Sequence, residues 1–350
     1  MKLLRIIHCS DLHFLTGSHP GAAVKSRVTG ALSKVRGFTQ GLAGHDPRAP
    51  RWLRASIHQY AKTAADEWKD KTELVFTGDL TTWADDASLT GAKKFLDTLQ
   101  ADLALSRSMG AYGNHDVWPG VVAGHLPWQE TTGNLETRRT KMRDAYFPRK
   151  TWLAERVRHP IPGGFVLGVC ALNTVLHCRV RNTFAYGQIG HDFYWDATRK
   201  VAKHQLVELE EWLADVHVGV ILSHHPFHDP DKSPGKRLLG ANRAKNALRS
   251  GPSGECIRLV LSGHTHQIFP DDLNRSVPLD KKMLSTRQLT TGTCAQAAVP
   301  NAVVEQTWQA IELSLDSSPG HLRVARKVFV RNGLGAFVGQ PEESVILKFD

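Results

Sequence analysis

The sequence predicts an α/β fold, because short apolar runs that end in polar clusters alternate with helical patterns. The runs at 3–7, 74–76, 218–222 and 257–261 each stop at residues that are typical of turns. Short runs rich in Val, Ile and Leu with such boundaries are typical of buried strands. Open α/β sheets place their sites beyond the carboxyl ends of the strands, so the polar clusters after these runs are the candidate functional residues.

Helical periodicity separates the predicted strands. Apolar residues recur at three- and four-residue spacing over 53–68 and over 206–216, and a third helix is expected at about 85–99. Near the end of the chain, 302–315 and 321–330 flank a cluster of turn residues and predict two adjacent strands.

A single domain over residues 1–350 is the better interpretation, because neither a linker composition nor an internal repeat divides the chain. Three connections are longer than the core fold needs and are predicted to be insertions, since such long segments are usually functional loops or disordered ones. These insertions lie near 15–50, 117–150 and 228–252.

The charge balance is basic. The chain has 44 Lys and Arg against 34 Asp and Glu, which gives a formal net charge of +10 and a pI near 9.4. A positive field favours phosphate-bearing substrates, and it equally permits contact with nucleic acid. The longest apolar stretch, Phe165–Leu172, is far shorter than the ~18 residues that a membrane span needs, so none is expected.

The cysteines and the start of the chain predict a cytoplasmic location. Five cysteines without a CxxC pair fit no closed disulfide framework. A candidate functional residue already stands at position 11, which leaves no room for a removable signal peptide. The expected compartment is therefore a reducing cytoplasm.

Five short motifs offer Asp, Asn and His side chains and no thiolate. They are Asp11-Leu12-His13, Gly78-Asp79, Gly113-Asn114-His115-Asp116, His224-His225-Pro226 and Gly263-His264-Thr265-His266. Mixed imidazole and carboxylate sets suit Mn, Fe, Co or Zn, and they argue against a Cys-rich structural zinc site. Two such ions ~3.5–4 Å apart can share a carboxylate, clamp a phosphoryl oxygen and activate water near neutral pH. Asp and Asn at strand ends are often only turn residues, so the ordered set carries the interpretation.

The spacing within two motifs predicts their local backbone. In an extended Asp-x-His both side chains point to one face, because the strand period is two. Extended backbone is therefore expected at Asp11–His13 and at His264–His266, so that each pair approaches the site from one side.

The five motifs in this order resemble the pattern of the calcineurin-like metallophosphoesterase superfamily, in particular its phosphodiesterase-like branch. The resemblance covers about Leu3 to Gln267. It implies a four-layer α/β/β/α sandwich of two mixed sheets, with the metals at the carboxyl ends of the strands. The separation of Asp11 from Asp79 is longer than in compact members, so the resemblance predicts the substrate pocket poorly.

The resemblance also implies a ligand set for two divalent or trivalent metal ions, with Mn, Fe and Zn as the candidates. The first ion would be held by Asp11, His13, Asp79 and His266, and the second by Asp79, Asn114, His224 and His264. Asp79 would bridge the two. His224 is the favoured ligand of the adjacent histidines, because the family's lone His is followed one residue later by Pro or a small residue, and His225 is then an outer or substrate contact. A slip of one residue on a strand would exchange the two imidazoles.

His115 and Asp116 are the catalytic residues that the resemblance implies. His115 would bind the phosphate or protonate the leaving oxygen, since its pKa lies near neutrality, and Asp116 would orient it. A purely structural role for His115 in its turn is the alternative. The expected substrate contacts are Asn114, His115 and His225.

The implied reaction is hydrolysis of a phosphodiester, a cyclic nucleotide or another small diester, by attack of a metal-bridging hydroxide on phosphorus. The alternatives are a metal-dependent nuclease of the recombination-repair type, whose members open with a similar Ser-Asp-Leu-His, and a phosphomonoesterase. A non-catalytic scaffold with this fold would lack ligands, whereas every ligand position is filled here. A small phosphate ester is thus the expected partner, nucleic acid is less favoured, and the oligomeric state is open.

Overall fold

The structure is a computed structural model that describes the core elements of the chain. The described residues are 1–14, 46, 48–63, 65–82, 85–105, 108–117, 137, 156–175, 187–189, 193–196, 201–228, 238–249, 256–270, 273, 278–280, 283–294, 305–318 and 320–349. Most of the predicted insertions near 15–50 and 117–150 lies outside these residues, whereas the one near 228–252 is described at 228 and 238–249.

The first sheet contains strands from both ends of the chain. Its order is β16-β15-β14-β1-β2-β3, with β17 also paired to β15. The strands are β1 (Lys2–Cys9), β2 (Thr72–Thr77), β3 (Ser108–Ala111), β14 (Thr307–Leu315), β15 (His321–Arg331), β16 (Phe337–Gly339) and β17 (Glu343–Lys348). β1, β2 and β3 are parallel, whereas β14 pairs antiparallel with β1 and β15, which confirms the two strands predicted near the end. The β1–β14 pairing supports the proposal of one domain.

The second sheet is also mixed, and its order is β12-β13-β11-β9-β5-β4. The strands are β4 (Arg156–Ile161), β5 (Phe165–Leu172), β9 (Val218–Ser223), β11 (Ile257–Ser262), β12 (Pro278–Asp280) and β13 (Met283–Thr290). β5, β9, β11 and β13 run parallel, and the two outer strands are antiparallel to their neighbours. Two small pairs lie outside both sheets, β6 (Gly187–Gln188) with β10 (Leu238–Leu239) and β7 (Phe193–Asp196) with β8 (Val201–His204).

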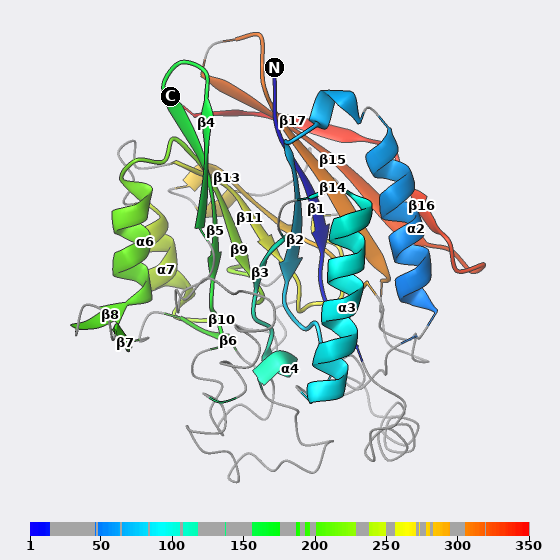
Figure 1. The fold of residues 1–350 in the computed structure, drawn as a ribbon. Coiled ribbons are helices and arrows are strands. Elements are labelled where there is room, and N and C mark those ends of the chain that lie inside the picture. Colours follow the sequence, from blue (N-terminus) through cyan, green and yellow to red (C-terminus); the bar gives the residue numbers. More distant parts are fainter. Residues whose placement is uncertain are drawn as a thin grey trace.

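Helices cover the outer face of each sheet, so the molecule has four layers (Figure 1). The helices are α2 (Ala49–Lys62) and α3 (Asp86–Asp102) on the first sheet, and α6 (Gln205–Leu213) and α7 (Ala241–Leu248) on the second. Short elements η1 (Asp66–Trp68) and α4 (Asn114–Val117) lie in connections. This arrangement confirms the predicted α/β/β/α sandwich of two mixed sheets.

Both faces of the central strands are buried, as the continuous apolar runs predicted. On β1, Leu4 and Ile6 point into the core between the two sheets, while Ile7 and Cys9 pack under α2 and α3. Each fully buried Leu or Ile side chain stabilises the fold by ~1.5–3 kcal/mol through the area it removes from water. The strands that carry the candidate site are therefore rigidly held.

One predicted helix ends earlier than its periodicity suggested. The pattern extended to Trp68, but α2 ends at Lys62, and the next residue, Thr63, has extended backbone. Trp68 is buried in η1 instead, where its ring lies 4.8 Å from the guanidinium of Arg5 and 4.8 Å from the ammonium of Lys2. Tertiary packing against β1 thus fixes Trp68 in place of helical continuation.

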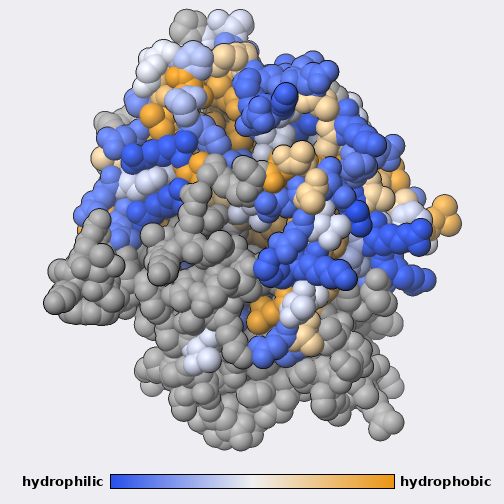
Figure 2. All heavy atoms as spheres, viewed as in Figure 1, coloured by the Kyte–Doolittle hydropathy of each residue, from blue (hydrophilic) through white to orange (hydrophobic). Residues whose placement is uncertain are grey.

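The described surface is mainly hydrophilic. On the face in Figure 2, hydrophilic side chains cover most of the described residues, with apolar ones interspersed. The exposed large apolar side chains among the described residues are Met1, Trp52, Val207, Leu334, Val338 and Ile346. None of the described helices combines the length and the apolar character that crossing a bilayer requires.

Candidate metal centre

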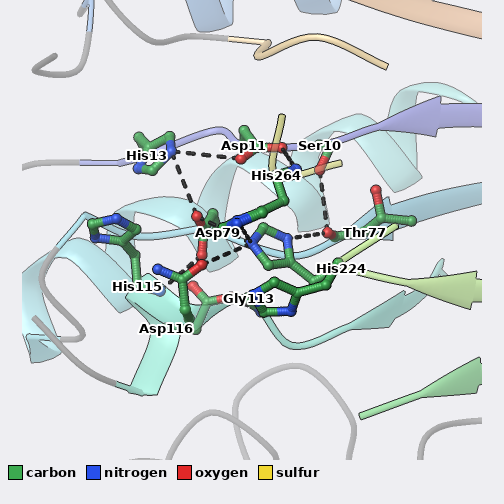
Figure 3. Close-up of polar contacts among 12 residues, drawn as sticks. Ser10, Asp11, His13, Thr77, Asp79, Gly113, His115, Asp116, His224 and His264 are labelled. Carbon is green, nitrogen blue, oxygen red and sulfur yellow. Dashed lines mark hydrogen bonds and ion pairs between the residues drawn. The ribbon is translucent and has the colours of Figure 1, made fainter. Parts of the chain in front are cut away.

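Five loops that follow neighbouring strands bring the motif residues into one site. Asp11 and His13 follow β1, Asp79 follows β2, Asn114 and His115 follow β3, His224 follows β9, and His264 and His266 follow β11. Because these strands run parallel within each sheet, their carboxyl ends meet at one edge of the sandwich. Figure 3 shows Asp11, Asp79, His224 and His264 gathered there, flanked by His13 and His115.

The backbone of most ligand candidates is left-handed rather than extended. The φ angles are 52° at Asp11, 47° at His13, 51° at Asp79, 68° at His264 and 57° at His266. The expectation of extended Asp-x-His and His-x-His segments is therefore wrong, since β1 ends at Cys9 and β11 at Ser262. A non-glycine residue in this region costs on the order of 1 kcal/mol or more and persists where its surroundings impose it, which is typical of functional sites.

Glycines let the ligand loops approach one another closely. A Cβ on Gly113 would lie 2.0 Å from the backbone nitrogen of Asp79, and a Cβ on Gly263 would lie 1.8 Å from Oγ of Ser10. At Gly78, where φ is 94°, a Cβ would lie 2.6 Å from Nδ1 of His224. No side chain fits at these three positions, so the motif glycines fix the distances between the loops.

The first cluster of ligand atoms consists of Asp11, His13 and His266. Nε2 of His266 lies 3.0 Å from Oδ1 of Asp11, and Nε2 of His13 lies 3.7 Å from the same oxygen. The other carboxylate oxygen of Asp11 accepts a hydrogen bond from the backbone N–H of His264, at 3.0 Å. All three side chains are buried, and their ligand atoms lie within 4.8 Å of one another.

The second cluster is centred on His224. Its Nε2 lies 3.0 Å from Oδ1 of Asn114, 3.1 Å from Nδ1 of His264 and 3.3 Å from Oδ2 of Asp79. Its Nδ1 lies 2.7 Å from the carbonyl oxygen of Thr77, to which it donates. That hydrogen bond fixes the tautomer, because it places the proton on Nδ1 and leaves Nε2 as the ligand atom.

Asp79 belongs to both clusters. Its Oδ2 lies 3.7 Å from Nε2 of His13 and 3.3 Å from Nε2 of His224. Its Oδ1 accepts a hydrogen bond from the backbone N–H of His115 at 2.8 Å. One oxygen of this buried carboxylate therefore faces the imidazoles of both clusters.

Neighbouring charges keep Asp79 ionised despite its burial. Burial alone would raise the pKa of Asp79, but the imidazoles of His224, His115 and His13 hold it well below its usual range. Burial likewise lowers the pKa of His224, while the charges of Asp79 and Asp11 outweigh it and raise that pKa to about 9. The carboxylate of Asp79 is therefore anionic, which is the form that binds metal, whereas His224 releases a proton when a cation binds.

The residues present fit two cations. Among the described residues, Oδ1 of Asp11 and Nε2 of His13, which lie 3.7 Å apart in the first cluster, are buried without a hydrogen-bond partner. Leaving such groups unsatisfied costs ~1–3 kcal/mol each, which a bound cation offsets. The candidate ligand atoms lie 3.0–3.7 Å from one another. This spacing suits a shared metal ion, because two ligand atoms that are each ~2.0–2.2 Å from one ion lie roughly 3–3.7 Å apart.

His115 and Asp116 differ in burial and in their hydrogen-bond partners. His115 is partly exposed, and its Nδ1 lies 3.1 Å from the carbonyl oxygen of Thr82. Asp116 is fully buried and accepts hydrogen bonds from the backbone N–H groups of Thr81 and Gly113, each at 2.9 Å. The carbonyl of Thr82 thus orients the His115 ring, whereas Asp116 joins the loop after β3 to the loop after β2.

Asp116 also has a raised pKa. Burial, reinforced by the charge of Asp79, raises the pKa of Asp116 to about 7, against the opposing effect of the hydrogen bonds from Gly113 and Thr81. The Asp116 carboxyl group is therefore held by two backbone N–H donors, although its burial and the nearby charge of Asp79 disfavour its ionised form.

His225 lies beside the second cluster and is fully buried. Its ring centroid is 4.2 Å from that of His264 and 4.9 Å from that of His224. Its Nδ1 is 2.8 Å from Oγ1 of Thr174. The two adjacent histidines reach the same cluster because β9 ends at Ser223, so the alternation of a strand does not separate them.

Several threonines that the sequence did not single out hold the site together. Oγ1 of Thr82 donates to the carbonyl of His13 at 2.7 Å, and Oγ1 of Thr293 donates to the carbonyl of Asp11 at 2.5 Å. Thr77 contributes its carbonyl to His224. Thr77 is adjacent to the Gly78-Asp79 motif and Thr82 follows it by three residues, whereas the chain order gives no sign of Thr293.

Comparison with known proteins gives a family match. A family model described as calcineurin-like phosphoesterase matches residues 4–268, which is most of the chain and includes every ligand candidate. No curated protein sequence matches the chain.

Several solved structures resemble the chain at low identity. A purple acid phosphatase from yellow lupin (Lupinus luteus) seeds is 14% identical, with a TM-score of 0.49 over 99% of this chain and 53% of that chain. The NAD nucleotidase of Haemophilus influenzae is 10% identical, with a TM-score of 0.37 over 99% of this chain and 56% of that one. Vps29 of Chaetomium thermophilum is 10% identical, with a TM-score of 0.35 over 99% and 100%.

The chain spans about half the length of the phosphatase and of the nucleotidase. Likenesses at this level assign neither an activity nor a substrate. The family match, the four-layer fold and the ordered motifs agree with one another, and they show that the chain belongs to the calcineurin-like phosphoesterase family.

Proposed function

We propose that this protein is a dinuclear-metal phosphoesterase whose substrate is a small phosphodiester, such as a cyclic nucleotide. The observation that carries the proposal is the position of Asp79, whose Oδ2 faces His13 at 3.7 Å and His224 at 3.3 Å. A single carboxylate between two imidazole clusters is what a shared pair of metal ions requires.

The ligand sets follow from the two clusters. Asp11, His13, Asp79 and His266 would hold one ion, and Asp79, Asn114, His224 and His264 the other. Imidazole with carboxylate and amide oxygen suits Mn, Fe or Zn. When bound, such ions supply positive charge to phosphoryl oxygens and lower the pKa of water toward neutrality.

His115 is positioned to serve the leaving group. Its Nδ1–H donates to the carbonyl of Thr82, which fixes the ring plane at the partly exposed side of the site. In the cationic ring the second proton is on Nε2, from which it can pass to the oxygen that leaves phosphorus. After that transfer the neutral ring keeps its Nδ1 proton and its contact with Thr82.

Asn114 and His115 are the proposed substrate contacts. Oδ1 of Asn114 faces the second metal position, 3.0 Å from Nε2 of His224, so its amide nitrogen is the group left to donate to a phosphoryl oxygen. His225, the third contact that the sequence suggested, is fully buried against His264 and Thr174, and its position is better explained by the metal site than by substrate.

The test compares a diester with a monoester. Bis(p-nitrophenyl) phosphate and p-nitrophenyl phosphate are each assayed with added Mn and with excess chelator. The proposal predicts metal-dependent turnover with the diester as the better substrate by kcat/KM. A preference for the monoester would identify a phosphomonoesterase. Absent turnover of both would support a non-catalytic scaffold, and turnover that does not depend on metal would refute the dinuclear-metal mechanism.

The nuclease alternative has its own test. The net charge of +10 permits DNA binding, which depends on salt when it involves several phosphates. Cleavage of linear DNA with a kcat/KM above that of the small diester would replace the proposed substrate class. Failure to cleave DNA at low salt, with turnover of the small diester, supports the proposal.

A further inference from the structure

A segment outside the sequence motifs holds the loop that carries Asp11. This segment, residues 291–294, follows β13 and lies beyond residue 268, where the family match ends. The hydroxyl of Thr293 donates to the carbonyl of Asp11 at 2.5 Å, and the backbone N–H of Cys294 donates to the carbonyl of Ser10 at 3.0 Å. Two successive carbonyls of the loop after β1 are therefore held by residues 291–294, which we call the strap.

The strap also joins the two sheets. The backbone N–H of Thr291 donates at 3.1 Å to the carbonyl of Ser262, the last residue of β11 in the second sheet. The backbone N–H of Thr307, the first residue of β14 in the first sheet, donates to the carbonyl of Thr293 at 2.8 Å. The strap therefore fixes how far the ligand loop after β1 lies from the ligand loop after β11.

The strap completes the hydrogen bonds that fix Asp11. The backbone N–H of Asp11 donates to the carbonyl of Gly78 at 3.0 Å, and its Oδ2 accepts from the backbone N–H of His264 at 3.0 Å. The Thr293 hydroxyl supplies the donor for the remaining backbone group, the carbonyl. Together these contacts impose the left-handed backbone of Asp11, with φ at 52°, and leave Oδ1 directed at Nε2 of His266, 3.0 Å away.

Glu305 holds the loop of His266 in a similar way. Its backbone N–H donates to the carbonyl of His266 at 3.1 Å, and its Oε2 accepts from the backbone N–H of Ile268 at 2.7 Å. A Cβ on Gly292 of the strap would lie 2.1 Å from the carbonyl oxygen of Glu305, so Glu305 and the strap are in direct contact. Asp11 and His266, which follow strands of different sheets, are therefore positioned by two neighbouring segments outside the motifs.

We propose that Thr293 and Glu305 are positioning residues for the first metal position, with Thr293 acting through Asp11 and Glu305 through the loop of His266. This inference rests on the proposed function, because it concerns the same metal centre. Loss of a partner that orients a metal ligand typically weakens metal binding ~10–100-fold. His224 of the second position is tethered instead by the carbonyl at the end of β2, so loss of Thr293 should weaken the first position selectively.

The experiment measures metal affinity in the full chain rather than turnover. Metal-free protein is titrated with Zn against a competing chelating dye, which gives the affinity of each of the two equivalents. Thr293→Val removes the hydroxyl and keeps the shape of the side chain, whereas Thr293→Ser keeps the hydroxyl. Thr291→Val is the matched control, because Thr291 is also buried in the strap but its hydroxyl lies 3.2 Å from that of Thr307.

Wild-type protein, Thr293→Ser and Thr291→Val are expected to bind two Zn per chain with the same two affinities. Thr293→Val is expected to bind one equivalent ~10-fold more weakly and the other unchanged. His13→Gln, which lacks a ligand of the first position, identifies the affected equivalent. Adding Thr293→Val to His13→Gln should not weaken the remaining equivalent further, because only the second position is left.

Unchanged affinity in Thr293→Val would overturn the inference. Equal weakening of both equivalents, or the same loss in Thr291→Val, would also overturn it, since the strap would then act only through general stability.

Should Thr293→Val fail to fold by near-ultraviolet circular dichroism, Glu305 tests the same assignment. Glu305→Ala should weaken one equivalent ~10-fold, whereas Glu305→Gln, which keeps an acceptor oxygen, should not. Unchanged affinity in Glu305→Ala would then contradict the inference. A wild-type protein that binds no metal would instead refute the proposed function itself.

Discussion

The backbone N–H of His115 donates a 2.8 Å hydrogen bond to Oδ1 of Asp79. This contact joins the carboxylate that lies between the two imidazole clusters to the residue proposed to serve the leaving group. It also orients Asp79 so that its other oxygen faces His13 and His224. The position of the proposed acid and the geometry of the bridge therefore depend on one another.

Replacing Asp79 by Asn should abolish metal-dependent turnover and leave the fold intact. Asn has the shape of Asp but no charge, so it cannot balance two cations. We expect kcat/KM to fall by more than the ~10²-fold that loss of an outer partner causes, with fewer than two metals bound. Metal analysis and circular dichroism check this. Asp97→Asn is the control, because Asp97 is exposed on α3 and forms an ion pair with Lys93, away from the site.

Replacing His115 by Ala should slow catalysis while both metals stay bound. Loss of a general acid costs ~10²–10⁴-fold in rate, and the cost grows as the leaving group becomes a poorer one. We therefore expect a larger fall in kcat for an alkyl diester than for a p-nitrophenyl diester. An equal fall for both leaving groups would point to a structural role of His115 in its turn.

Adding one methyl group at Gly263 should damage the metal centre. A Cβ there would lie 1.8 Å from Oγ of Ser10 and 2.5 Å from Oδ2 of Asp11, so the loops after β1 and β11 must separate. We expect Gly263→Ala to lower the free energy of unfolding by ~1–3 kcal/mol and to weaken metal binding. Gly333→Ala is the matched control, because a Cβ at Gly333 meets nothing within 4 Å. Equal behaviour of the two variants would contradict the close approach.

His8 should make the fold sensitive to acid. Burial, partly offset by the charge of Asp11, lowers the pKa of His8 from 6.5 to about 3 in the folded protein. Below pH 6.5 the unfolded chain therefore binds a proton that the folded chain does not. The stability that neutral His8 confers is complete above about pH 6.5 and is lost as the pH falls toward 3, at ~1.4 kcal/mol per pH unit.

Urea unfolding at pH 7.5 and pH 5 with excess chelator measures this effect. His8→Gln should destabilise the protein less at pH 5 than at pH 7.5, by about 2 kcal/mol in the free energy of unfolding. The same pair of measurements on His228→Gln, in which an exposed histidine is replaced instead, serves as the reference. A destabilisation by His8→Gln that does not vary with pH would show that the ring is not kept neutral.

The sequence predicted the layers of the fold and the members of the site for a physical reason. Apolar runs that are buried on both faces can be recognised from the local sequence, and β1 and β9 end within one or two residues of those runs. The motif residues follow such strands directly, so the topology brings them together once the sandwich forms. The order of the strands and helices and the candidate metal ligands can therefore be predicted from short contiguous segments of the sequence.

The geometry inside the site depends on contacts between distant segments, and the sequence did not predict it. Left-handed backbone at Asp11 and His264 results from loops that glycines allow to interlock, whereas the local pattern suggested extended strands. The hydrogen bond from the Thr293 hydroxyl to the carbonyl of Asp11 joins two residues that are far apart in the chain. Helix α2 likewise ends at Lys62 because Trp68 packs against Arg5, which no helical period encodes.

The role of the adjacent histidines illustrates the same limit. Strand alternation implied that only one of His224 and His225 could face the site, but both lie beyond the end of β9 and contact His264. The tethers that orient them, the carbonyl of Thr77 and the hydroxyl of Thr174, come from two other strand ends. The cytoplasmic location stays a prediction.

The most direct test of the metal centre is metal stoichiometry measured together with turnover. Purified protein is stripped with chelator and then titrated with Mn or Zn, and bis(p-nitrophenyl) phosphate hydrolysis is recorded at each step. The Asp79 bridge predicts no activity in the stripped protein, and full activity only as two metal equivalents per chain are bound. Saturation of activity at a single equivalent, or hydrolysis that persists after complete removal of metal, would contradict it.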